Sequence, residues 1–246
     1  MARVVSWFSC GAASAVATKI AIQKYGGGVV PVYCDTGAEH PDSKRFMADC
    51  EEWMGVRVKV LKSAKYPDTW SVWEDRKYLA GIAGAPCTKA LKVSLRQAFE
   101  DPEDIQIFGY TADSSDVRRA KRFGEAFFDV DTEFPLIEAG IKKDACLAMI
   151  DDAGIDIPVP YKLGFHNNNC LPCVKAQAPS YWALIRQEFP KEFDRMVELS
   201  RRLGVRLAKI GEERIFIDDI PADQPTVNPI VPSCDFLCAI AAKDYE

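Results

Sequence analysis

Residues 4–14 read Val-Val-Ser-Trp-Phe-Ser-Cys-Gly-Ala-Ala-Ser, an apolar run that ends in a turn of small residues. The pattern predicts a strand over 4–8, a turn that begins at Ser9, and a helix over 12–23. Small residues let a backbone turn approach an anion closely, and the amide groups at a helix N-terminus favour negative charge. The stretch therefore predicts a phosphate-binding loop, although a plain strand–turn–helix connection with a serine N-cap has the same pattern.

The alternation of strand and helix continues through the first half of the chain. Apolar, β-branched runs predict strands over 29–33, 56–61 and 105–110, and amphipathic spacing predicts helices over 41–54 and 88–99. Such alternation is typical of α/β proteins, in which a parallel twisted sheet carries helices on both faces. The fold class that we expect is therefore Rossmann-like α/β.

The rhythm changes after about residue 135. Helices are predicted over 144–153, 180–188 and 191–203, and four prolines then follow at close spacing, which excludes a regular helix. We expect a nucleotide-binding α/β core over residues 1–135. Over residues 136–246 we expect a mostly helical portion with a cysteine-bearing loop and an extended tail, packed on the core.

Composition places the chain among ordinary soluble proteins. Its 246 residues carry a formal net charge of -5, and hydrophobic residues make up 48%. We recognise no leader peptide and no apolar run of about 18 residues, so we expect a cytoplasmic protein without a membrane partner. Nine cysteines are many for a reducing compartment, where disulfides rarely persist. They indicate metal ligands, reactive thiols or core residues instead.

Two further turns of small and polar residues follow predicted strands. The second strand runs into Cys34-Asp35-Thr36-Gly37. The fourth runs into residues 109–115, Gly-Tyr-Thr-Ala-Asp-Ser-Ser, with Arg118 and Arg119 after them. Because the C-terminal ends of parallel strands share one edge of a sheet, these turns are expected to meet the first at a single site.

The three turns, in this order, resemble the phosphoadenosine phosphosulfate (PAPS) reductase family and its PP-loop relatives in the adenine nucleotide alpha-hydrolase-like superfamily. The resemblance covers residues 4–173. It implies an adenine nucleotide as ligand, either ATP, PAPS or adenosine phosphosulfate (APS), with magnesium as a further candidate cofactor. The nucleotide-binding residues that it implies are Ser9, Cys10, Gly11, Ala12, Ser14, Asp35, Thr36, Gly37, Gly109, Asp113, Arg118 and Arg119.

The chain departs from the family pattern at four positions. Cys10 replaces a glycine, and Ala13 replaces the loop aspartate that assists metal–pyrophosphate chemistry in ATP-cleaving relatives. Thr111 and Ser114 stand where the family has arginine and glutamate. These changes weaken the case for ATP adenylation but leave nucleotide binding by backbone amides intact. Cys10, near a helix N-terminus that favours a thiolate, and Asp35 are candidate catalytic residues.

Cys170-Leu171-Pro172-Cys173 forms a C-x-x-C in an asparagine-rich loop, and Cys87 precedes a predicted helix. Sulfonucleotide reductases with a four-iron cluster resemble this arrangement, since they carry a Cys-Cys pair before a helix and a later C-x-x-C. The resemblance implies a [4Fe-4S] cluster on Cys87, Cys170 and Cys173, with Cys234 or Cys238 as the fourth ligand. A structural zinc site and unligated thiols are the alternatives.

Three other cysteines are expected in the core. Cys34 ends a predicted strand, and Cys50 and Cys146 lie on the apolar sides of predicted helices. Free cysteine is commonly buried as a small hydrophobic residue. His40 and His166 lie beside the site motifs, but each is expected to be structural or exposed.

Three functions remain open. The first is a PP-loop enzyme of sulfur transfer, with a thioredoxin-like sulfur or electron donor and nucleic acid as a candidate acceptor. The second is a thiol-dependent PAPS or APS reductase with Cys234 as nucleophile, although the family's Glu-Cys-Gly-x-His motif is altered here. The third is a non-catalytic nucleotide-binding protein. The basic segment 118–122 is either a nucleic-acid patch or a solvated helix face, and a homodimer is a candidate assembly.

Overall fold

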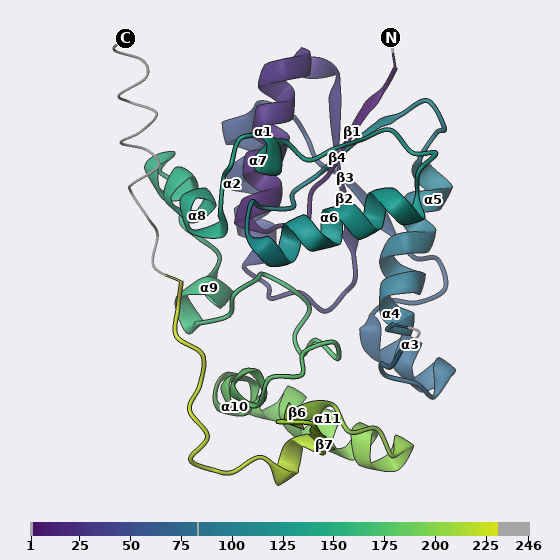
Figure 1. Cartoon of the computed structure of the whole chain (residues 1–246), viewed down its shortest axis with the longest axis vertical. Coiled ribbons are helices and arrows are strands. Elements are labelled where there is room, and N and C mark those ends of the chain that lie inside the picture. The colour runs from purple at the N-terminus through teal and green to yellow at the C-terminus, as the bar shows by residue number, and fades with distance from the viewer. Residues whose placement is uncertain (1, 83, 231–246) are drawn as a thin grey trace.

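The computed structural model describes residues 2–82 and 84–230 (Figure 1). Its centre is a five-stranded sheet in the order β3-β2-β1-β4-β5, in which all neighbouring strands are parallel. The strands are β1 (Val4–Trp7), β2 (Val29–Asp35), β3 (Lys59–Lys62), β4 (Ile105–Phe108) and β5 (Thr132–Glu133). The predicted α/β class with a parallel sheet is confirmed.

Helices cover both faces of the sheet. Ile107 of β4 belongs to the hydrophobic cluster that contains α1 (Ala12–Tyr25). The next residue, Phe108, packs on Phe123 of α6 (Ser114–Ala126), with ring centroids 4.6 Å apart. Because successive side chains of a strand point to opposite faces, α1 and α6 lie on opposite sides of the sheet. The remaining helices of this half are η1 (Gly26–Gly28), α2 (Ser43–Met54), α3 (Thr69–Arg76), α4 (Pro86–Thr88), the π-helical turn η2 (Lys89–Val93) and α5 (Ser94–Phe99).

After β5 the chain is mostly helical, as predicted. The elements are α7 (Pro135–Glu138), α8 (Lys143–Asp152), α9 (Val159–Leu163), α10 (Pro179–Glu188), α11 (Pro190–Leu203), β6 (Ala208–Ile210), β7 (Glu213–Ile215) and η3 (Ile217–Asp219). The β6–β7 hairpin is not predicted from sequence, because strands of three residues are too short to show alternation. Residues 221–230 contain no helix or strand, in keeping with the proline spacing. Among the residues described, no helix is long and apolar enough to cross a membrane.

Two large hydrophobic clusters and a small third one, of Tyr66, Val72 and Leu91, make up the core of the described residues. The first joins α1 and α2 with residues of α7, α8 and α9, among them Leu136, Leu147 and Tyr161. The second joins Trp73 of α3 with α10 and α11. The helices after residue 135 share a core with the strands and helices before it, because α7 and α8 pack directly on α1. Over its described residues, the portion expected over 136–246 is therefore packed on the core.

Gly109, directly after β4, lets the end of this strand lie against the first turn of α1. A Cβ at residue 109 would lie 2.7 Å from the Cα and 2.8 Å from the backbone nitrogen of Ser14. We expect Gly109→Ala to lower the free energy of unfolding by about 1–3 kcal/mol, the usual cost of overpacking. Urea denaturation measures this change.

Gly124→Ala is the matched control for Gly109→Ala. Gly124 lies within α6, and nothing stands within 4 Å of the Cβ that alanine would add. The control should be stabilised by up to about 1 kcal/mol, because alanine is the better helix former. Equal unfolding free energies for the two variants would contradict the close approach of Gly109 to α1.

Candidate functional site

The candidate site lies at the C-terminal ends of β1 and β4. The chain passes from β1 to β2 on one side of the sheet centre, whereas β4 lies on the other side of β1 and leads to β5. Such a reversal opens a crevice between the two strands, where ligands of open α/β sheets bind. The turns after Trp7 and Phe108 border this crevice, so the first and third predicted motifs do lie together.

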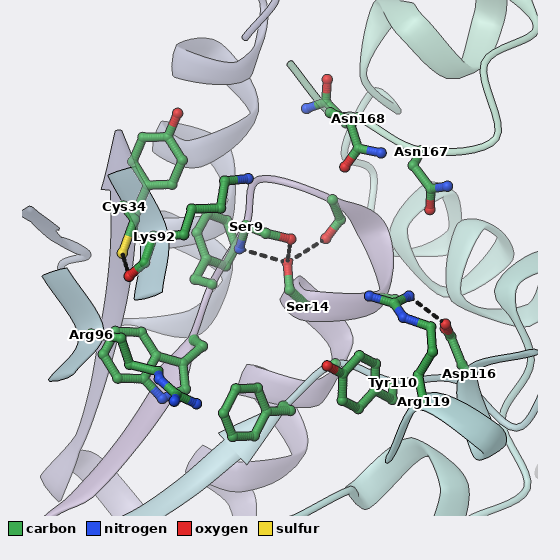
Figure 2. A pocket seen from close by; sticks show the side chains of 18 of the residues that line it. Ser9, Ser14, Cys34, Lys92, Arg96, Tyr110, Asp116, Arg119, Asn167 and Asn168 are labelled. Atoms are coloured by element: carbon green, nitrogen blue, oxygen red, sulfur yellow. Dashed lines mark hydrogen bonds and ion pairs between the residues drawn. The ribbon is translucent and has the colours of Figure 1, made fainter. Parts of the chain in front are cut away.

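The Ser14 hydroxyl holds the turn after β1 in shape. It accepts hydrogen bonds from the Ser9 backbone N–H at 3.0 Å and the Ser9 hydroxyl at 3.1 Å, and it donates to the Gly11 carbonyl at 2.9 Å (Figure 2). These contacts use the Ser14 proton inside the turn, so Ser14 shapes the loop rather than donating to a ligand. Cys10 has a φ of 56°, the left-handed conformation in which glycine is usual.

Three amide groups of this turn are free to bind an anion. No acceptor within residues 2–82 or 84–230 is hydrogen-bonded to the backbone N–H of Gly11, Ala13 or Ser14, and all three residues line the cavity above the turn. A left-handed residue followed by a helix N-terminus forms an anion-binding nest, and the helix dipole adds attraction. The turn can therefore bind a phosphate or sulfate group.

The cavity over the turn has a volume of about 440 Å³. The charged side chains that line it are four cations, Lys92, Arg96, Arg119 and Lys143, and one carboxylate, Asp116. Figure 2 shows Lys92 reaching toward the turn from one side and Arg119 from the other. In a chain of net charge -5, this local excess of positive charge favours an anionic ligand.

One end of the cavity is aromatic. The Arg96 guanidinium lies 5.0 Å from the centroid of the Phe123 ring and 4.9 Å from that of Phe127, and Trp7 and Phe108 complete the wall. Aromatic faces stack on heterocyclic bases. A cavity with an apolar, aromatic end and a cationic end suits a nucleotide, whose base and phosphates need these two environments.

The third motif supplies one of its two predicted arginines. Both arginines are exposed, but only Arg119 lines the cavity, where Asp116 holds it at 2.7 Å. The buried Thr111 hydroxyl lies 2.8 Å from Asp113 and 3.0 Å from Asp116. Thr111 and Asp113 therefore fix the turn. Asp113 is expected to bind the nucleotide, but it does not line the cavity.

The second motif is divided between the two cavities: Cys34 lines the first and Thr36 lines a second, smaller one. Asp35 accepts a hydrogen bond from the Gly37 amide at 2.9 Å and pairs with Lys62 at 2.9 Å. Burial raises the pKa of Asp35, but the contacts with Lys62 and Gly37 outweigh burial and leave this pKa below its usual value. The Thr36 hydroxyl lies 3.0 Å from the Sγ of Cys170. Asp35 lines neither cavity, so its predicted catalytic role finds no support in this geometry.

Two cysteines differ from prediction, Cys10 in the role of its thiol and Cys34 in its surroundings. Cys10 is 1% exposed within the core cluster, and burial raises the pKa of its thiol above the usual range, so its backbone rather than its thiol serves the turn. Cys34 lines the cavity, contrary to the prediction of a core residue, because β2 continues to Asp35 and carries Cys34 to the strand end. Burial raises the pKa of the Cys34 thiol to about 11. Cys50 and Cys146 are fully buried, as predicted.

Cys87, Cys170 and Cys173 line a second cavity of about 70 Å³. The structure thus brings together the three described thiols that the sequence groups as metal ligands. Burial raises the pKa of the Cys170 thiol to about 12, and it raises that of Cys87 as well. Both thiols would release protons on binding a metal, because the thiolate is the ligand.

The second cavity also holds hydrogen-bond donors that suit sulfur. The Thr69 hydroxyl, in α3, is buried beside this cavity and has no partner within the described part of the chain. Burial raises the pKa of the Cys87 thiol, and the buried Trp73 indole of α3 lies beside this thiol and partly offsets that rise. A buried donor without an acceptor is costly. Metal-bound sulfur atoms accept such bonds, and these bonds tune iron–sulfur sites. The thiols and donors of this cavity are of the kind that a sulfur-ligated metal uses, but the three described thiols are not spaced as a ligand group.

The ligand set is not complete within the described chain. In residues 2–82 and 84–230, no group of three or more His, Cys, Asp or Glu side chains is spaced to hold a metal ion. The predicted fourth ligands, Cys234 and Cys238, lie outside the described residues. His40 and His166 line neither cavity, and His166 is exposed.

Lys92 lines both cavities and is a site residue that the motifs do not reveal. It lies in the π-helical turn η2, five residues after Cys87. A π turn holds one more residue than an α turn, so ordinary helical spacing does not place Lys92 beside the thiols. Burial lowers the pKa of Lys92, but the nearby Cys170 and Glu39 raise it and prevail. Lys92 therefore remains charged between the two cavities.

Asn168 connects the loop over residues 166–173 to the turn after β1. Its Nδ2 donates to the Cys10 carbonyl at 2.6 Å and to the Ser43 hydroxyl at 3.0 Å. Its Oδ1 is buried and has no partner among the described residues, although Asn168 lines the first cavity. The run of three asparagines before Cys170 was the only sequence signal for it.

Comparison with known proteins adds no family to this description. No protein-family profile matches the chain, and no curated protein matches it. The resemblance to PAPS reductases therefore rests on the three motifs and the cysteine spacing alone.

We expect Cys173→Ala to lose bound metal while the nucleotide cavity is kept, because Cys173 lines the second cavity only. The measurement is anaerobic purification with iron, sulfide and zinc quantification and an absorption spectrum. The wild type should carry about four irons and four sulfides per chain, as a [4Fe-4S] cluster requires.

Cys50→Ala is the control for Cys173→Ala, since Cys50 is a buried thiol in the core of α2 that lines neither cavity. It should keep the wild-type metal content. One zinc per chain would identify the structural zinc site instead, and equal metal content in wild type and Cys173→Ala would remove Cys173 from the ligands.

Proposed function

We propose that the chain is an adenine-nucleotide-binding PP-loop enzyme of the PAPS reductase family that holds a [4Fe-4S] cluster and acts in sulfur transfer. One observation carries the proposal. A cavity lined by four cations, over a turn with three amides that have no acceptor in the described chain, shares the lining residues Lys92 and Asn169 with a second cavity lined by three thiols. A nucleotide site alone would not need this neighbour.

The first cavity supports a defined orientation of the nucleotide. The phosphates would bind the amides of Gly11, Ala13 and Ser14, flanked by Lys92 and Arg119. The base would then lie toward the aromatic end of the cavity. This orientation directs the charged end of the nucleotide toward Lys92, and hence toward the thiol cavity.

The thiol cavity supplies the sulfur chemistry in this proposal. A cluster bound to Cys87, Cys170 and Cys173 would provide sulfur or electrons. Lys92 would offset negative charge on the nucleotide and on the thiolates at once, since it lines both cavities. A thioredoxin-like protein is the class of donor that regenerates such a site.

A nucleic acid is the acceptor class that we propose for the transferase. Arg118, Lys121 and Arg122 are exposed on α6, the helix that also places Arg119 in the cavity. Exposed cations beside the nucleotide site would bind a phosphate backbone.

A sulfonucleotide reductase is the second candidate, and one observation favours it. Asp116 is the one carboxylate among the described residues that line the nucleotide cavity, and it is engaged by Arg119. Magnesium-assisted cleavage of ATP needs oxygen ligands for the ion, whereas thiol attack on a sulfonucleotide does not. The family nucleophile would correspond to Cys234, which lies outside the described residues.

Isothermal titration with adenosine 3′,5′-bisphosphate and a non-hydrolysable ATP analogue, followed by a turnover assay, separates these functions. Turnover of ATP to AMP supports the transferase, and preference for the bisphosphate supports the reductase. Tight binding with no turnover leaves a non-catalytic nucleotide-binding protein.

Gly11→Val serves as the binding-deficient variant in that titration. A Cβ at residue 11 would lie 3.1 Å from the Tyr161 hydroxyl, and the two further methyl groups of valine would obstruct the amide nest. Gly27→Val, where a Cβ meets nothing within 4 Å, is its control. Nucleotide affinity that survives Gly11→Val unchanged would overturn the loop assignment.

A further inference from the structure

Tyr161 places a hydroxyl group beside the amide nest, against Gly11 and Ala12. The residue comes from α9, 149 positions along the chain from Ala12, and its Oη accepts a hydrogen bond from the Ala12 backbone N–H at 3.3 Å. Tyr161 also lines the nucleotide cavity. The C-terminal portion of the chain therefore reaches the phosphate turn with a polar group that no motif predicts.

The proton of this hydroxyl has no acceptor in the described part of the chain. A tyrosine hydroxyl both accepts and donates, and here the single recorded contact uses it as acceptor. The residue is 2% exposed, so solvent satisfies little of the remaining capacity. The donor is left for whatever enters the cavity.

The ring that carries the hydroxyl is fixed. It belongs to the same core cluster as the first turn of α1. The Val159 N–H donates to Asp42 at 2.9 Å, which anchors the start of α9 to the turn before α2. The N–H of Phe165 donates to the Pro160 carbonyl at 2.9 Å and closes the C-terminal end of α9 itself. The Tyr161 ring therefore does not need to move when a ligand binds, because it is already packed in the core.

We propose that Tyr161 donates its hydroxyl proton to the anionic group bound in the turn, as an additional ligand-binding residue beside the amides of Gly11, Ala13 and Ser14. The inference rests on the proposed nucleotide site. Tyr161 of α9 completes the phosphate site, so the N-terminal α/β core alone lacks one of its hydrogen-bond donors.

Tyr161→Phe tests the inference, because it removes the hydroxyl and keeps the ring. Calorimetric titration with ATP and with inorganic pyrophosphate should show affinity about tenfold weaker than wild type for both, as for the loss of one hydrogen bond to a charged group. The unfolding midpoint is measured alongside.

Two controls accompany Tyr161→Phe. Tyr66→Phe removes another buried tyrosine hydroxyl, one that bonds Asp75 and lies at neither cavity, and should bind like wild type. Ile150→Val trims the same core cluster without touching the hydroxyl. It shows whether a loss of stability alone weakens binding.

The outcomes separate the two levels of the argument. Binding by wild type with unchanged or tighter binding by Tyr161→Phe overturns the role of Tyr161 and leaves the nucleotide site standing. Weakening of equal size in Ile150→Val also overturns it. Absence of binding by the wild type overturns both the site and the inference.

Discussion

The hydrogen bonds of the Ser14 hydroxyl are the constraint on which the site depends. By joining Ser9 to the Gly11 carbonyl, this group closes the turn after β1 and leaves the neighbouring amides without internal acceptors. Gly109 then lets β4 approach the same turn at backbone distance, which sets the width of the crevice. The geometry of the turn is therefore a property of backbone and packing, and it accommodates Cys10 and Ala13.

The loop over residues 166–173 connects the phosphate turn to the thiols. Asn168 holds the Cys10 carbonyl, Asn169 lines both cavities, and Cys170 contacts the Thr36 hydroxyl of the second motif. One short segment thus links all the parts of the site that sulfur chemistry on a nucleotide would require. Lys92 places a positive charge at the junction. Because Lys92 and Asn169 line both cavities, we treat the two cavities as parts of one proposed site.

The sequence predicts the parallel sheet, the turn at Ser9 and the grouping of three cysteines, because each depends on local pattern or on spacing. It misassigns Asp35 and Cys34, because β2 runs further than its β-branched residues indicate and sets Asp35 into turn hydrogen bonds. Lys92 is missed because a π turn changes the helical phase. Tyr161 is missed because a five-residue helix after prolines shows no periodicity, and its contact with Ala12 is purely tertiary.

The most direct test of the central claim is an amide-resolved ¹H–¹⁵N NMR titration of the wild-type protein with adenosine 3′,5′-bisphosphate. If the turn binds the phosphate, the amide protons of Gly11, Ala13 and Ser14 shift downfield together as each gains a charged acceptor. The amides of Gly26–Gly28, at the other end of α1 and outside the residues that line the cavity, stay in place. Binding that shifts other amides while these three remain unchanged would contradict the account.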